Sequence, residues 1–243
     1  MKSFGLTDIG KKRKVNQDYL FFSDEAVGCF PNLYIVADGM GGHKAGDKAS
    51  SYSVTRFVEL ARKTEKDLPF LSMEKILKQV NHEVFQLSRR EEEYAGMGTT
   101  FVAATVVDKV VYVMNVGDSR LYYYDGNLKQ VTMDHSLVEE LVRAGELNRQ
   151  ESRNHPQKNI ITKAVGVSED IQPDFFMLDI QEGEKILLCS DGLTNMVDDE
   201  KLEEIMSESE ELNQMAQECI DEALFFGGLD NIAVVIAQYG NGR

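Results

Sequence analysis

Three observations predict an α+β fold in which sheets and helices form layers. Several strand-like runs follow one another with hairpin spacing, which favours antiparallel sheets. Two runs with helical periodicity lie together between early strands, and one long helical run precedes the last strand. Because helices grouped in this way cover the faces of sheets, the sequence predicts a sandwich of packed sheets and helices.

Short strands and then two helices make up the first part of the chain. Residues 3–9, 19–23 and 32–37 read as strands, and the basic loop GKKRKVNQD joins the first two. A second helix follows Pro69, carries one apolar stripe and has Ser72 as its expected N-cap. The first helix follows DGMGGHKAGD and is predicted from an i, i+3, i+4, i+7 repeat of Val54, Phe57, Val58 and Ala61.

Strands dominate the rest of the chain. Asp-Gly-Asn at 125–127 indicates a hairpin turn, and Ser136 with Glu139 forms a capping box for a helix to about Ala144. The polar residues 145–158 give no assignment, and a last helix covers about 212–224. We expect the strands at 99–107, 110–116, 120–124, 128–132, 159–162, 173–179, 184–190 and 231–238.

The length and composition suit one domain over 1–243. Of the 243 residues 42% are hydrophobic, and the four prolines mark no linker. The formal charge of 26 − 41 = −15 disfavours nucleic acid and anionic membrane surfaces as partners. The start, MKSFGLTDIG, lacks the apolar region of a secretion signal, and no apolar run approaches the roughly 18 residues of a membrane span. We therefore expect a cytoplasmic protein without a membrane anchor.

The cysteines and histidines do not predict a metal site of their own. Three widely separated cysteines, Cys29, Cys189 and Cys219, suggest neither a disulfide framework nor a cysteine-type zinc site. The four histidines show no paired ligand spacing. Zinc is therefore not expected.

Four aspartates lie at the ends of probable buried strands. Asp38 and Asp191 each end an apolar run as Asp-Gly, Asp118 follows a valine-rich run, and Asp230 comes just before the last strand. A single Asp-Gly is most simply a turn, because both residues favour turns. If the four strand ends converge, however, the carboxylates form a cluster that requires a cation or raised pKa values. Hard oxygen ligands of this kind suit Mg²⁺ or Mn²⁺.

Metal-assisted hydrolysis of a phosphate ester fits these carboxylates. No cysteine is followed six residues later by Arg, no Asp-x-Asp occurs, and the Gly-Lys at 10–11 does not continue as a P-loop. Two divalent ions can activate a water and stabilise in-line displacement at phosphorus. Arg13, in KKRKVNQD, could grip the phosphate as a bidentate fork, although a solvated basic loop explains the same run equally well.

Eight motifs, in order along nearly the whole chain, resemble the metal-dependent protein phosphatases (PPM, the PP2C-like serine/threonine phosphatases) in their bacterial single-domain form. The resemblance implies a four-layer sandwich, in which two packed antiparallel β-sheets are flanked by α-helices, with a flap near the active site at about 136–160. The motifs are RKVNQD (13–18), ADGMGGHKAGD (37–47), GMGTT (96–100), NVGDSR (115–120), DHSLVEELV (134–142), ITKAVG (161–166), LLCSDGLTN (187–195) and DN (230–231).

The same resemblance implies a set of metal ligands. Asp38 would bridge two Mn²⁺ or Mg²⁺ ions, Asp191 and Asp230 would complete the first ion, and the carbonyl of Gly39 would bind the second. Asp118, with Asp191, resembles the site of a third, weaker ion in bacterial members.

Other residues receive roles around the ions. Arg13 would hold the phosphoryl group, Asp18 would bind metal waters, and Asn231 would support a water. Animal members of the family often have a histidine, a candidate general acid, where this chain has Met40. His43 is expected to start the following helix and is not an equivalent, so the source of that proton stays open.

The implied activity is hydrolysis of phosphoserine and phosphothreonine esters on proteins by a hydroxide held between two ions. The implied partners are phosphoproteins, including a cognate membrane-anchored serine/threonine kinase, and a monomer is expected. Residues 137–163 hold five basic and four acidic side chains, so this segment either meets phosphopeptides or is an ordinary solvated loop. Two alternatives on the same fold are a catalytically dead binding module and an anti-sigma-antagonist phosphatase, which typically sits beside a sensor domain.

Overall fold

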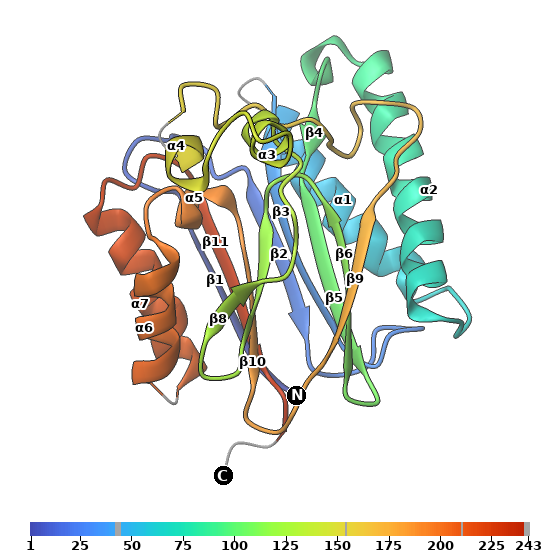
Figure 1. The fold of residues 1–243 in the computed structure, drawn as a ribbon. Helices are drawn as coiled ribbons and strands as arrows, with labels where there is room; N and C mark the ends of the chain where they lie inside the picture. The colour runs from blue at the N-terminus through green and yellow to red at the C-terminus, as the bar shows by residue number, and fades with distance from the viewer. Residues whose placement is uncertain (42–44, 154, 210, 241–243) are drawn as a thin grey trace.

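The computed structural model describes residues 1–41, 45–153, 155–209 and 211–240. Within these residues, the predicted long helices and strands appear in the expected order except for the strand at 159–162, and three helices that were not predicted, Arg149–Arg153, Asp191–Thr194 and Asp199–Glu208, lie among them (Figure 1). The strands are β1 (Lys2–Asp8), β2 (Asp18–Ser23), β3 (Leu33–Met40), β4 (Gly98–Thr99), β5 (Phe101–Val107), β6 (Val110–Val116), β7 (Arg120–Tyr124), β8 (Leu128–Gln130), β9 (Asp174–Asp179), β10 (Lys185–Cys189) and β11 (Ile232–Gln238). The helices are α1 (Ala45–Ala61), α2 (Pro69–Arg90), the 3₁₀ turn η1 (Glu92–Tyr94), α3 (Leu137–Arg143), α4 (Arg149–Arg153), α5 (Asp191–Thr194), α6 (Asp199–Glu208) and α7 (Leu212–Phe225).

The strands form two antiparallel sheets. One has the order β1-β11-β10-β7-β8, and the other has the order β2-β3-β5-β6-β9, with the short β4 paired to β3. Figure 1 shows the sheets packed face to face, with α1 and α2 outside one sheet and α6 and α7 outside the other. This arrangement confirms the predicted sandwich of two sheets flanked by helices.

Three apolar clusters separate the four layers. Successive residues of a strand point to opposite faces, so a strand buried on both faces is apolar throughout. In β11, Ala233 and Val235 pack between the sheets, whereas Ile232 and Val234 pack against α6 and α7. In β3 the side chains alternate in the same way: Tyr34 packs between the sheets, whereas Leu33 and Ile35 pack under α1 and α2. The catalytic candidates therefore stand at the ends of rigid strands.

Several expectations about local structure were wrong. Helix α2 begins at Pro69 with Leu68 as N-cap, so Ser72 is not a cap but a buried residue inside the first turns. Residues 159–162 do not form a strand and make only an isolated bridge between Ser136 and Ile161. Ser136 does cap α3 by accepting from the Glu139 backbone, while the Glu139 side chain pairs with Arg149 instead of closing the box. His43 lies outside the described residues.

Among the helices of the described residues, none is both long enough and apolar enough to cross a bilayer.

Candidate metal and phosphate site

Five aspartates meet at one end of the sandwich because the strands that carry them end there. Asp18 and Asp38 are direct partners in the β2–β3 register, Asp118 follows β6, Asp191 follows β10, and Asp230 precedes β11. Four of the five line a cavity of about 230 Å³, which we call the first cavity. Its lining residues are Arg13, Gln17, Asp38, Gly39, Met40, Gly41, Thr100, Asp118, Asn159, Ile161, Asp191, Asp230 and Asn231.

Burial and mutual repulsion raise the pKa values of four carboxyls, those of Asp18, Asp38, Asp118 and Asp191. Burial is the largest cause at Asp18, whose pKa rises to about 7 despite a hydrogen bond from Ser190. Burial, followed by the charges of neighbouring aspartates, also raises the pKa of Asp38 and Asp118 well above its ordinary range, and that of Asp191 as well. Carboxyl groups with such pKa values bind cations or share protons.

Two carboxylate oxygens in this cluster are buried without a hydrogen-bond partner among the described residues. They are Oδ1 of Asp18 and Oδ1 of Asp191. Buried polar oxygens are rarely left unpaired in a protein, so each of them calls for a water or an ion as its partner. A hard divalent cation answers both this requirement and the repulsion among the carboxyls. The donor set therefore fits Mg²⁺ or Mn²⁺.

The carboxylates are gathered but do not form a closed cage. Over the described part of the chain, no three His, Cys, Asp or Glu side chains already stand as a set of metal ligands. The Asp18 and Asp191 carboxyls each interact with that of Asp38, whereas Asp230 accepts a 2.6 Å hydrogen bond from Nη2 of Arg13. Ligands for an ion are thus present on separate strands, and an ion would draw them together.

Hydrogen bonds from neighbouring strands hold the carboxylates in place. Ser190 donates to Oδ2 of Asp18 at 2.6 Å and accepts from the backbone N–H of Ala233 at 2.9 Å. Asn195 donates to Oδ2 of Asp191 at 2.8 Å. Charge-assisted bonds of this kind are roughly twice as strong as neutral ones, so they orient the carboxyls of Asp18 and Asp191 at their strand ends.

Arg13 and Asn231 show that the two ends of the chain build the site together. The Arg13 guanidinium lines the first cavity, pairs with Asp230 and is half-exposed. Oδ1 of Asn231 accepts from the Gln17 backbone, and its Nδ2 donates to the carbonyls of Ile9 and Val15. Asn231 thus ties down the loop that carries Arg13, while its expected support of a water stays a prediction.

Gly39 lies on the wall of the first cavity beside Asp38. A Cβ at this position would stand 2.0 Å from the Gly46 carbonyl oxygen, so only glycine allows the backbones of β3 and α1 to approach. The binding of an ion by the Gly39 carbonyl stays a prediction.

Asp118 is held through the preceding residue, Gly117, whose φ of +104° favours glycine. The Gly117 N–H donates to Nδ1 of His135 at 3.0 Å, and the His135 N–H donates back to the Gly117 carbonyl at 3.0 Å. On the other side of the ring, Nε2 lies 3.1 Å from Oδ2 of Asp174 and 3.2 Å from Nζ of Lys163. Burial lowers the pKa of His135, so the ring stays neutral and Nδ1 can accept.

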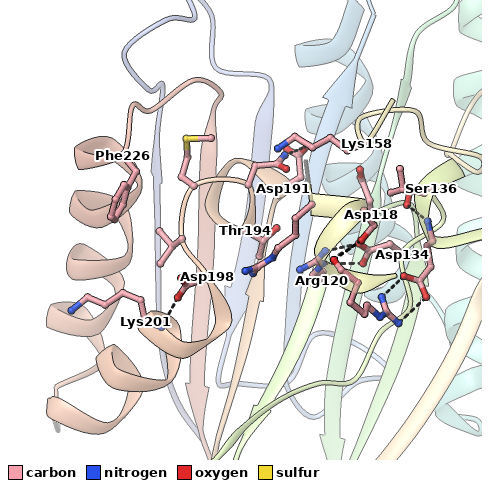
Figure 2. A pocket seen from close by; sticks show the side chains of 18 of the residues that line it. Asp118, Arg120, Asp134, Ser136, Lys158, Asp191, Thr194, Asp198, Lys201 and Phe226 are labelled. Carbon is pink, nitrogen blue, oxygen red and sulfur yellow. Dashed lines mark hydrogen bonds and ion pairs between the residues drawn. The ribbon is translucent and has the colours of Figure 1, made fainter. Parts of the chain in front are cut away.

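A larger cavity of about 440 Å³, the second cavity, adjoins the first, because Asp118 and Asp191 line both (Figure 2). One wall comes from α3, α4 and the residues after them, and the other from α5, α6 and the end of α7. Sequence reasoning missed the second wall. The only sequence signal for this wall was that the motif LLCSDGLTN continues beyond its Asp-Gly into residues that line the second cavity.

Comparisons with known proteins agree with this geometry. The family model "Protein phosphatase 2C" matches residues 10–224. The "Serine/threonine phosphatase stp" of Listeria monocytogenes is 40% identical over 242 residues, which is 96% of this chain and 93% of the relative.

Solved structures of bacterial phosphatases have the same fold. Serine/threonine phosphatase Stp1 from Staphylococcus aureus has a TM-score of 0.92 and 30% identity, with 99% of this chain and 95% of that chain covered. The catalytic domain of the serine threonine protein phosphatase PstP in complex with 2 manganese ions has a TM-score of 0.85 and 30% identity, with coverage of 98% and 97%. With the fold, the carboxylate cluster and both kinds of similarity in agreement, the chain belongs to the protein phosphatase 2C family.

Proposed function

We propose that this chain is a protein serine/threonine phosphatase that hydrolyses phosphoserine and phosphothreonine esters with two Mn²⁺ or Mg²⁺ ions. The observation that carries the proposal is the first cavity, which gathers four aspartates, three of them with raised pKa values, beside the guanidinium of Arg13. The relatives named as serine/threonine phosphatases support the substrate class, and the manganese of the PstP complex supports the metal.

Asp38, Asp191 and Asp230, with the carbonyl of Gly39, would hold the two ions. When bound, divalent ions supply Lewis-acid stabilisation of the phosphoryl oxygens and an activated water for in-line attack at phosphorus. Asp118, with Asp191, would hold a third and weaker ion.

The other residues position the substrate around that centre. Arg13 presents a planar fork that matches two phosphoryl oxygens, and its bond to Asp230 holds the guanidinium at the cavity. Asp18, which accepts a hydrogen bond from Ser190 and is the register partner of Asp38, would bind metal waters. Met40 lines the cavity and carries no exchangeable proton, so the leaving serine or threonine oxygen takes its proton from water.

The cellular part of the proposal follows the family resemblance. We place the enzyme in the cytoplasm as a monomer, where it would oppose a membrane-anchored serine/threonine kinase. The net charge of −15 disfavours nucleic acid as a partner.

Metal dependence tests the proposal. Hydrolysis of para-nitrophenyl phosphate and of a phosphothreonine peptide should vanish in chelator and return with Mn²⁺, because the carboxylates of the first cavity need a cation. Asp191→Ala should lose several orders of magnitude in turnover, since one carboxylate serves more than one ion. Asp221→Ala, an exposed aspartate on α7, is the matched control and should keep full activity.

Two outcomes would overturn this function. Full turnover in excess chelator would exclude the two-ion reaction. A chain that binds Mn²⁺ and phosphopeptide but hydrolyses neither substrate would be a binding module on a phosphatase fold.

A further inference from the structure

The second cavity begins where the first one ends. Asn159 and Ile161 line the first cavity, Lys158 lines the second, and Asp118 and Asp191 line both. Residues 158–161 therefore run along the boundary between the two spaces. The neighbouring residues of a polypeptide whose phosphorylated side chain enters the first cavity can therefore lie along the second.

Two of the cations in the second cavity serve the fold. Arg120 donates to both carboxylate oxygens of Asp134, with its closest contact at 2.7 Å, and Arg149 makes a two-point pair with the buried Glu139. These two pairs form part of the cavity wall, and a ligand does not readily replace them, because the carboxylates of Asp134 and Glu139 are largely buried and would lose their partners.

Three further cations are open to a ligand. Lys158 has no ion-pair partner among the described residues, and Figure 2 shows its side chain at the edge of the cavity near Asp191. Arg153 and Lys201 pair with Asp199 at 3.5 Å and Glu204 at 3.0 Å, two half-exposed carboxylates outside the cavity lining. Exposed pairs of this kind are weak, so a carboxylate of a ligand can replace them.

Two acidic residues, Asp198 and Glu222, lie on the same wall as Lys201, and Asp118 and Asp191 line the boundary with the first cavity. Asp198 is committed to capping α6, because it accepts from the Lys201 backbone at 2.9 Å, and Glu222 is the other acid on this part of the lining. Over the whole lining five basic side chains face six acidic ones, so the preference for an acidic residue rests on Lys158, which has no ion-pair partner among the described residues, and not on a net positive charge. Val138 and Phe226 add apolar surface, which suits a peptide rather than a small hydrated ion.

We propose that the second cavity receives the substrate residues that flank the phosphorylated side chain and prefers an acidic side chain there, which pairs with Lys158. The inference rests on the proposed phosphatase function and adds a specificity to it. The occupant is a segment of the phosphoprotein substrate, because the two cavities share their boundary and a substrate bound in one extends into the other. Arg153 and Lys201 would extend the preference to residues farther from the phosphate.

The test compares phosphothreonine peptides that carry Glu, Gln or Lys in turn at each of the three positions on either side of the phosphoresidue. The wild-type enzyme should prefer Glu over Gln at one or more positions by about two- to fivefold in kcat/KM, as expected for one partly exposed ion pair. At the same position Lys158→Gln should lose the preference, and Lys158→Glu should prefer the Lys peptide. High salt should weaken the wild-type preference.

A matched control separates the site from general electrostatics. Lys66→Glu changes the charge equally at an exposed position outside both cavities and should retain the wild-type preference for Glu. Lys201→Glu is a second variant and should alter the preference only at positions farther from the phosphate.

Two results would overturn the inference. One is an unchanged Glu-to-Gln ratio in Lys158→Glu, and the other is a wild-type enzyme that hydrolyses all peptides equally. Either result leaves the phosphatase function standing, because the phosphopeptides are still hydrolysed and the metal dependence is unaffected.

Discussion

The metal-free protein should lose stability as the pH rises from 5 to 8. In the fold, burial raises the pKa of Asp18 from 3.8 to about 7. Because this folded-state value lies above the unfolded one, the group stabilises the fold while it is protonated, and the contribution disappears as the pH passes through about 7. Asp18 therefore lowers the stability of the fold mainly as the pH rises from about 4 to 7.

The magnitude follows from the same pair of values. A rise of the Asp18 pKa from 3.8 to about 7 corresponds to a loss of about 4 kcal/mol in the free energy of unfolding, of which about 2 to 3 kcal/mol falls between pH 5 and 8. For a chain of this length the melting temperature should fall on the order of 5–10 °C. Asp38, Asp118 and Asp191 act in the same direction, since their pKa values are raised as well.

The assay is thermal unfolding of the dialysed, metal-free protein at pH 5 and pH 8, repeated with Mn²⁺. Ions and protons compete for the carboxylates, so Mn²⁺ should stabilise the protein more at pH 8 than at pH 5. Burial lowers the pKa of His135, which therefore stabilises the fold as the pH rises and partly opposes the trend. Asp18→Asn isolates the acid contribution and should shrink the fall, so an equal fall in this variant and in the wild type would refute the reasoning.

Three further changes test single residues. Arg13→Lys keeps the charge but loses the guanidinium fork, so its kcat/KM on para-nitrophenyl phosphate should fall by about 1.5–3 kcal/mol at low and high salt, nearly as much as in Arg13→Ala. Lys14→Ala is the control and should cost well under about 1 kcal/mol. Full activity of Arg13→Lys would contradict the role of Arg13 as the phosphate ligand. Asp118→Ala should still bind two ions in calorimetry but turn over more slowly, and the loss of all ions would place Asp118 in the main pair. His135→Leu should lower the free energy of unfolding in denaturant by about 1–3 kcal/mol, because the buried Gly117 N–H loses its acceptor. His135→Asn keeps an oxygen near that N–H and should lower it less. Equal losses in the two variants would argue against the hydrogen bond from Gly117 to His135.

The sheets and the aspartates could be predicted because their signals are local. Buried runs such as those around β3 and β10 are apolar on both faces, and the aspartates mark the points at which these runs stop. The roles of the aspartates came from family resemblance, because nothing within one run shows that distant strand ends converge. The structure adds that convergence.

The second cavity could not be predicted, because it depends on contacts between segments far apart in the sequence. Helix α6 is short and largely charged, and it is helical here because Leu202, Ile205 and Met206 pack under α7. The residue type of Ser72 favours a helix cap, but the helix already begins at Pro69, so Ser72 lies inside its first turns. Likewise, no local pattern shows that Asn231 holds the loop at Ile9.

The pairing of Arg13 with Asp230 sets a condition on protein synthesis. These residues are 217 positions apart, and the bond from Gln17 to Asn231 spans 214. A nascent chain that has not yet exposed residues 230 and 231 outside the ribosome holds Asp18 and Asp38 but lacks both the partner of Arg13 and the tie on its loop. Folding that depends on such distant contacts is also slow. A ribosome stalled before β11 therefore carries an inactive chain, however much of the rest has folded.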